Sequence, residues 1–182
     1  MSATRNAGGT AALHIALLRG INVGGNKMVA MAALRDMATQ LGLREARTIL
    51  QSGNLLFRTR KAPAQVEKLL EKELEDVTVF VRSAEELSAM IDSNPFPEEA
   101  ERDPGRLVVL FLKQACDAKA LQASIVGTEV ARGKGREIYI HYPDGQGRSK
   151  LTNAVIEKKL ATRATARNWN TVMKLASLVG EE

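Results

Sequence analysis

A glycine-rich loop near the N-terminus has the residue types that bind anions. It runs from Arg19 to Lys27, between a predicted strand and a predicted helix, and a loop in that position aims backbone N–H groups at an anion. Gly20 and Gly25 have the spacing of a P-loop, yet Asn26 stands where that motif requires lysine. We interpret the loop either as an anion site or as a tight turn that needs glycine. Its candidate ligand-binding residues are Arg19, Gly20, Asn22, Gly24, Gly25 and Lys27.

A second polar loop, from His141 to Lys150, also joins a predicted strand to a predicted helix. Its last three residues fall at the predicted start of a helix over residues 150–160, where cations oppose the helix dipole unless they hold an anion. We interpret this loop either as a further anion site or as solvated surface. Its candidate residues are His141, Asp144, Arg148, Ser149 and Lys150.

A third polar segment, residues 166–171, surrounds the single tryptophan of the chain. Asn168 is predicted to cap a C-terminal helix, and Trp169 is predicted to enter the core. Asn168 and Asn170 would equally suit the wall of a polar binding site, so both are candidate ligand-binding residues.

Groups suited to catalysis or to metal binding are few. The two histidines are His14, in a predicted buried strand, and His141. Cys116 is predicted to start a helix, but no histidine accompanies it, so we interpret it as structural. No metal-ligand spacing occurs. The sequence therefore identifies no catalytic residue and no cofactor, and it predicts no metal site.

The hydrophobic pattern predicts that an α+β fold carries these loops. In the first half, strands are expected at residues 13–18, 48–51, 55–58 and 77–81, and helices at 31–41 and 66–74. That order is β-α-β-β-α-β. Ser83 and Glu86 have capping-box spacing and predict one more helix, which ends at Asn94.

The same order recurs after a charged segment. Strands are expected at residues 107–112, 129–132, 137–142 and 165–167, and helices at 118–125 and 150–160. We predict two tandem ferredoxin-like β-α-β-β-α-β halves with an extra C-terminal helix. The predicted organisation is a mobile tail (1–12), a first half (13–97), a linker (98–106) and a second half (107–182).

Composition limits the partners and the location. The single cysteine excludes an intrachain disulfide, so a cytoplasmic location is expected, and the apolar runs are too short for a membrane partner. The formal net charge of +5 suits an anionic small molecule or nucleic acid, and the basic excess lies in the second half. Nothing in the sequence indicates an oligomeric state.

Five segments resemble the bacterial family called domain of unknown function 1697. They are Leu-Leu-Arg-Gly-Ile-Asn-Val-Gly-Gly-Asn-Lys from Leu17, Leu-Gln-Ser-Gly-Asn from Leu50, Asn-Pro-Phe-Pro from Asn94, His-Tyr-Pro-Asp-Gly from His141 and Ala-Arg-Asn-Trp-Asn-Thr from Ala166. The likeness runs from about Leu13 to the C-terminus and departs at Ala30, where the family usually carries proline. The resemblance implies a ferredoxin-like, two-part α/β arrangement, and it implies no activity, cofactor or catalytic residue.

Three functions are compatible with these features. The first, which we prefer, is binding of a phosphate-bearing or other anionic ligand in a cleft between the two halves. The second is nucleic-acid binding by the basic second half. The third is an enzyme that acts on a small anionic substrate, for which the polar groups must converge in one cleft, above all Arg19, Asn22, His141 and Asp144.

Overall fold

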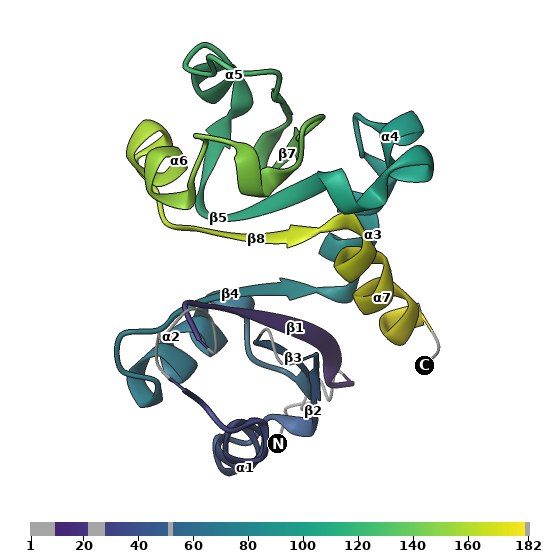
Figure 1. The fold of residues 1–182 in the computed structure, drawn as a ribbon. Helices are drawn as coiled ribbons and strands as arrows, with labels where there is room; N and C mark the ends of the chain where they lie inside the picture. Colours follow the sequence, from purple (N-terminus) through teal and green to yellow (C-terminus); the bar gives the residue numbers. More distant parts are fainter. Residues whose placement is uncertain (1–9, 22–27, 51–52, 181–182) are drawn as a thin grey trace, which may run out of the picture.

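The computed structural model of the chain contains two four-stranded antiparallel sheets (Figure 1). It describes residues 10–21, 28–50 and 53–180. The first sheet has the strand order β2-β3-β1-β4 and is built from β1 (Ala12–Arg19), β2 (Arg44–Ile49), β3 (Asn54–Thr59) and β4 (Thr78–Ser83). The second sheet has the order β6-β7-β5-β8 and is built from β5 (Leu107–Asp117), β6 (Val130–Arg132), β7 (Lys134–His141) and β8 (Ala164–Asn168).

The two sheets face each other, and helices cover their outer faces (Figure 1). Helices α1 (Met31–Gln40) and α2 (Pro63–Glu73) cover the first sheet, and α5 (Ala118–Gln122) and α6 (Asn153–Leu160) cover the second. Helices α3 (Ala84–Asp92) and α7 (Trp169–Gly180) pack together at one end of the sheets, next to α4 (Pro97–Arg102). The predicted α+β class is confirmed. No helix within the described ranges has the length and apolar character that crossing a membrane requires.

The central strands are buried on both faces, which explains their uninterrupted apolar runs. On β1, Ile15 and Leu17 face the second sheet, whereas Ala16 and Leu18 face α1 and α2. The central core between the sheets also receives side chains from β4, from β5 of the opposite sheet and from the C-terminal helix α7. Among them are Phe80, Val109, Phe111, Trp169 and Val172. One core therefore holds the two halves together.

Two predicted helix caps are present. The Ser83 hydroxyl accepts a hydrogen bond from the Glu86 N–H at 3.1 Å, and the Glu86 carboxylate accepts one from the Ser83 N–H at 2.9 Å. At the other helix that borders the central core, the Asn168 side chain accepts a hydrogen bond from the Thr171 N–H at 2.9 Å. Both caps fix the point at which the chain leaves a strand and turns along the edge of the core.

The helix predicted over residues 150–160 begins later, at Asn153. The Thr152 hydroxyl accepts a hydrogen bond from the Val155 N–H and serves as the cap, while Ser149 bonds to the Leu151 N–H and holds the preceding residues outside the helix. Arg148 ends a short 3-10 turn. The prediction that Arg148, Ser149 and Lys150 lie at the start of this helix was therefore wrong. Within α6, Val155 is exposed to solvent.

Smaller differences follow from local hydrogen bonding. The segment 98–106 contains most of α4 and a 3-10 turn over Pro104–Arg106. Cys116 lies on β5 and does not start a helix, because Asp117 caps α5 by accepting the Lys119 N–H. Residues 1–9 of the predicted tail lie outside the described residues, and β1 begins at Ala12.

Arg82 of β4 crosses from the first sheet into the second. Its side chain is 2% exposed, and its Nε donates to the Glu137 carboxylate at 2.5 Å. One Nη donates to the carbonyl oxygens of Leu112 and Arg136, at 3.1 and 3.2 Å. The guanidinium also lies over the ring of Phe111. A buried arginine thus ties β4 to β5 and β7 of the opposite sheet.

Arg167 of β8 makes the same crossing in the opposite direction. Its Nε donates to the Asn54 side chain at 2.7 Å, and one Nη donates to the carbonyl oxygens of Leu18 and Gly53, at 3.2 and 3.4 Å. Burial lowers the pKa of Arg167 to about 10, so the guanidinium still carries its charge at neutral pH.

The two arginines occupy equivalent places in the two halves. Ile15 pairs with Leu56 and Arg82, and Val109 pairs with Tyr139 and Arg167. We then count along the strands from Ile15 and Val109. The acceptors of Arg167 in the first half match those of Arg82 in the second half: Leu18 with Leu112, Gly53 with Arg136, and Asn54 with Glu137. The halves are therefore related by an approximate two-fold axis that the sequences of the two halves do not reveal.

Arg82→Lys is expected to lower the free energy of unfolding by about 2–4 kcal/mol, because a lysine ammonium cannot reach three separate acceptors and leaves buried carbonyl oxygens unsatisfied. Urea denaturation measures the change. The control is Arg102→Lys on the exposed face of α4, which should change the free energy by less than about 0.5 kcal/mol. Equal losses in the two variants would contradict the crossing role of Arg82.

Candidate functional site

A cavity of about 480 Å³ opens between the two halves, where β1 ends and the glycine-rich loop begins. The first half contributes Arg19 and Gly20 to its wall. The second half contributes the outer edge of β8 and the start of α6, with polar side chains that include Gln146, Asn153, Asn168 and Thr171. The cavity therefore combines residues that are more than one hundred positions apart in the sequence.

Arg19 is the cation that the first half directs at this cavity. One Nη donates to the Glu157 carboxylate of α6 at 2.9 Å, and the side chain is 29% exposed. The other Glu157 oxygen accepts the Ala164 N–H, also at 2.9 Å. The Nε of Arg19 is buried, and no residue that the structure describes accepts a hydrogen bond from it. Arg19 is thus held in place by one carboxylate and keeps one unused donor.

The free edge of β8 adds a backbone donor. Because N–H groups alternate in direction along a strand, Ala166 directs its N–H to the same side as Ala164, away from β5. Ala164 has Glu157 as its acceptor on that side, whereas no acceptor for the Ala166 N–H lies within the described ranges. Ala166 lines the cavity, so this outward edge of β8 forms part of its wall.

The electrostatic character of the cavity is positive. Arg19 and Arg167 both contribute to its wall, and Arg167 remains protonated at neutral pH despite its lowered pKa. The start of α6 at Asn153 adds the positive end of a helix dipole. These groups favour an anion, and the carboxylate of Glu157 neutralises only part of the positive charge.

Most of the chain matches a known family. Residues 12–139 match the family described as "Protein of unknown function (DUF1697)". The chain belongs to this family. The match includes Arg19 and Arg82 and ends before Asn153 and Arg167.

A solved structure resembles this DUF1697 protein over nearly its whole length. It is the conserved bacterial protein SP0830 from Streptococcus pneumoniae, with 26% sequence identity and a TM-score of 0.73, over 92% of this chain and 98% of that one. No curated protein matches the chain. The family predicted from the sequence motifs is therefore confirmed, and its description names no activity.

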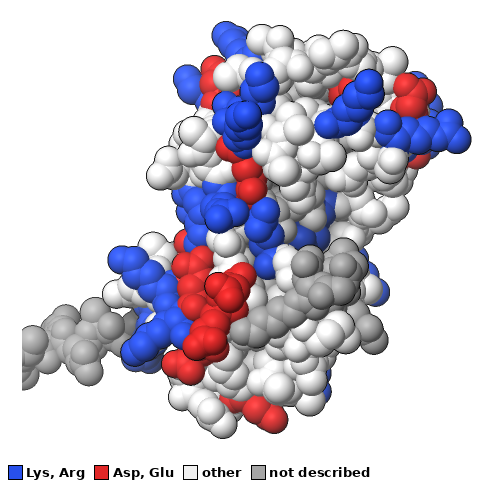
Figure 2. Space-filling view, turned by 60° about the vertical axis from the view of Figure 1, so that its left-hand side comes forward, with Lys and Arg blue, Asp and Glu red and all other residues white. Residues whose placement is uncertain are grey.

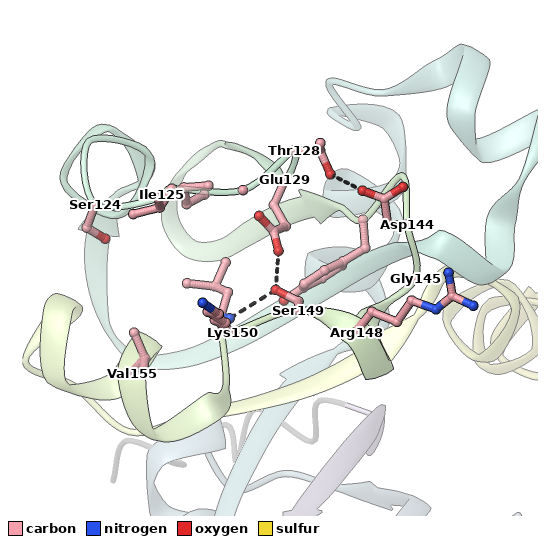
Figure 3. Close-up of a pocket in the computed structure, with 14 residues that line it drawn as sticks. Ser124, Ile125, Thr128, Glu129, Asp144, Gly145, Arg148, Ser149, Lys150 and Val155 are labelled. Atoms are coloured by element: carbon pink, nitrogen blue, oxygen red, sulfur yellow. Dashed lines mark hydrogen bonds between the residues drawn. The ribbon is translucent and has the colours of Figure 1, made fainter.

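A second cavity of about 410 Å³ lies within the second half of the DUF1697 protein (Figure 3). Figure 3 shows the Glu129 carboxylate turned toward Ser149, to which it is hydrogen-bonded, and Asp144 bonded to Thr128. Arg148 and Lys150 line this cavity and point in different directions. Asp144 and Ser149 of the second loop are therefore bonded to Thr128 and Glu129 of the segment that leads into β6.

The structure divides the predicted site residues into separate groups. Arg19, Gly20 and Asn168 line the cavity between the halves, whereas Asp144, Arg148, Ser149 and Lys150 line the second cavity. His141 and Asn170 line neither of these two cavities. Asn22, Gly24, Gly25 and Lys27 lie outside the described residues.

The histidines and the cysteine have structural surroundings. The ring of His14 stacks on Phe57, and that of His141 lies at a tilt against Phe96. The pKa of the Cys116 thiol is raised by burial, which opposes formation of a thiolate. Arg19, Asp144 and His141, which the enzyme hypothesis requires in one cleft, do not share either cavity.

Sequence reasoning missed several groups that form the cavity between the halves. Asn153 belongs to no motif, Gln146 and Ala166 lie in the second and third polar segments but were not named as candidates, and a backbone donor has no signal in sequence. Glu157 was not among the predicted site residues, yet it positions Arg19. Only the placement of α6 against the end of β1 reveals these roles.

The two tyrosines of the chain provide a matched test of buried hydroxyl groups. Tyr142 is 1% exposed, and its hydroxyl has no hydrogen-bond partner among the described residues, whereas the Tyr139 hydroxyl donates to the Met90 carbonyl at 2.5 Å. Tyr142→Phe should leave the free energy of unfolding unchanged or raise it by up to about 1 kcal/mol, because it removes an unsatisfied polar group. Tyr139→Phe should lower it by about 1–2 kcal/mol.

Thermal and urea unfolding of the two phenylalanine variants measure the difference. A loss of stability in Tyr142→Phe as large as that in Tyr139→Phe would show that the Tyr142 hydroxyl has a partner.

Proposed function

We propose that this DUF1697 protein binds a small anionic ligand in the cavity between its two halves. The observation that carries the proposal is the buried Nε of Arg19, which lacks an acceptor within the described ranges. A buried N–H donor without an acceptor is costly, and an anion in the adjacent cavity would give the partly exposed Arg19 guanidinium a second partner besides Glu157. Charge-assisted hydrogen bonds of this kind are among the strongest that proteins make.

Three further groups support an anion in the same place. The Ala166 N–H opens into the cavity, the first turn of α6 lies beside it, and Arg167 adds a second positive charge to its wall. Backbone N–H groups and a helix start next to arginine are a common combination in anion sites. The binding energy would come from electrostatics and hydrogen bonding more than from apolar contact.

A small ligand is favoured over nucleic acid by the distribution of charge. Figure 2 shows acidic side chains beside the basic ones on the face that it presents. Several cations of the second half are paired, including Arg136 with Glu86 and Arg163 with Glu157. Nucleic acid needs an extended basic surface, whereas Arg19 and Arg167 line one cavity between the halves.

We also infer that each half is ferredoxin-like. Both halves have the element order β-α-β-β-α-β, and in both the first strand lies between the third and the fourth. All the pairings within each sheet are antiparallel. These features support the arrangement in each half and leave α3 and α7 as matching additions after the fourth strands.

The proposal predicts that anions raise the melting temperature of the protein and that Arg19 is required for the effect. The test is a thermal-shift screen of chloride, sulfate, phosphate, acetate and nucleotides at one constant ionic strength. A ligand at 100 times its dissociation constant stabilises the folded state by about 2.7 kcal/mol. Arg19→Gln should abolish the shift, because it removes both the charge and the unused donor.

The matched control is Arg148→Gln, which removes a cation from the second cavity and should keep the shift. If no anion stabilises the wild-type protein, or if Arg19→Gln keeps the full shift, the cavity between the halves is not an anion site.

A further inference from the structure

In the first half, the place that corresponds to the cavity between the halves is filled by a carboxylate. The strand equivalence described above matches Arg19 with Lys113 and Ala166 with Val81. Glu67 of α2 lies between these two partners: one of its oxygens accepts the Val81 N–H at 2.8 Å, and the other accepts Lys113 Nζ at 2.8 Å. The counterparts of the Ala166 N–H and of the Arg19 cation are thus both satisfied in the first half.

A neighbouring pair of glutamates fixes the alignment of the two helices. Glu71 of α2 accepts the Val79 N–H at 2.9 Å and lies 2.8 Å from Lys113 Nζ. Glu157 of α6 accepts the Ala164 N–H at 2.9 Å and lies 2.9 Å from Arg19. Because Val79 corresponds to Ala164 in the strand equivalence, Glu71 corresponds to Glu157.

One turn earlier on each helix, the equivalence breaks. The residue four positions before Glu71 is Glu67, and the residue four positions before Glu157 is Asn153. Asn153 is shorter, uncharged and exposed, and it stands at the start of α6, whereas α2 begins four residues before Glu67. The second half therefore keeps both donors and lacks the internal carboxylate that would join them.

We infer that the ligand is a small carboxylic acid whose carboxylate takes the position that Glu67 occupies in the first half. One ligand oxygen accepts the Ala166 N–H, and the other accepts a hydrogen bond from the Arg19 guanidinium, as Glu67 does from the Lys113 ammonium. The inference rests on the proposed function and specifies its ligand. Two donors that a planar two-oxygen group bridges in the first half suit a carboxylate better than the tetrahedral oxygens of phosphate or sulfate.

The polar lining of the rest of the cavity indicates that the acid carries further polar groups beside its carboxylate. Gln146, Asn168 and Thr171 offer amide and hydroxyl groups beyond the two donors, and the volume of about 480 Å³ exceeds what a carboxylate alone fills. A hydroxy acid or another polar carboxylic acid fits this lining. An acyl chain does not, because its apolar surface would displace water from polar groups without replacing their hydrogen bonds.

Asn153→Glu supplies the missing carboxylate from the protein itself. The variant should melt about 3 °C above the wild type, since the new side chain can bridge Arg19 and the Ala166 N–H as Glu67 bridges their counterparts. It should also lose the thermal shift that acetate and glycolate produce in the wild type. Sodium salts of acetate, glycolate, sulfate and phosphate are compared at one ionic strength, and the difference between wild type and variant removes general salt effects.

Ala154→Glu is the matched control for charge and helix dipole. It adds the same charge in the same helical turn, but Ala154 does not line the cavity and borders a different surface with Lys158 and Arg163. The control should therefore retain the full response to acetate and glycolate.

The reciprocal variant, Glu67→Ala, should create a second position in the first half at which a carboxylate stabilises the protein. It removes the internal carboxylate from Lys113 and the Val81 N–H, so the variant should melt below the wild type, and acetate should restore part of the loss. In the double variant Glu67→Ala with Asn153→Glu, acetate should still raise the melting temperature, because the position in the first half is empty.

The outcomes separate the two proposals. If sulfate or phosphate protects the wild type through Arg19 and carboxylates do not, the anion site stands and the carboxylate inference is overturned. A carboxylate shift that persists in Asn153→Glu also overturns it. If none of the salts protects the wild type, both proposals fail together.

Discussion

The two arginines that cross between the sheets are the interaction on which the arrangement of this protein depends. The side chain of each arginine extends from the last strand of its own half. It donates to two backbone carbonyl oxygens and one polar side chain of the other half. Apolar packing between flat sheet faces does not by itself fix one lateral register, whereas a fork of directional hydrogen bonds does. Arg82 and Arg167 therefore fix how the sheets lie on one another, and with that the position of every group at the junction.

The candidate site follows from the near symmetry that these arginines maintain. Both junctions contain a cation on the central strand, a glutamate on the facing helix and outward N–H groups on the edge strand. An edge strand with unpaired donors is a liability that proteins usually cover, and α2 covers β4 with Glu67 and Glu71. At β8, α6 supplies only Glu157, because Asn153 stands where α2 has Glu67. The missing second glutamate therefore explains both the uncovered Ala166 N–H and the cavity beside it.

Much of the fold could be predicted from local pattern. The helical spacing of Leu34 and Ala38 and of Val66 and Leu70 matches their burial, and the capping box at Ser83 forms as its spacing indicates. The start of α6 was misjudged because Thr152 competes with earlier residues as the cap, and a side-chain hydrogen bond at Ser149 decides between them.

The candidate site was less accessible to sequence reasoning, because its contacts are made between distant segments. Arg167 and Asn54 are 113 residues apart, and a charged residue in a short extended segment reads as exposed. The near symmetry was hidden for a related reason: Leu56 corresponds to Tyr139, and Asn54 to Glu137, so equivalent positions share a geometric role and not a residue type.

The central core has a consequence for how the chain folds. Its members come from β1, β3 and β4 on one side, from β5 and β7 on the other, and from both α3 and α7. Either half in isolation would expose a whole sheet face that includes Phe80 or Phe111, an apolar surface much larger than soluble monomers usually carry. The two halves repeat one strand order, and each covers the apolar sheet face of the other, so we expect them to unfold together as one cooperative unit.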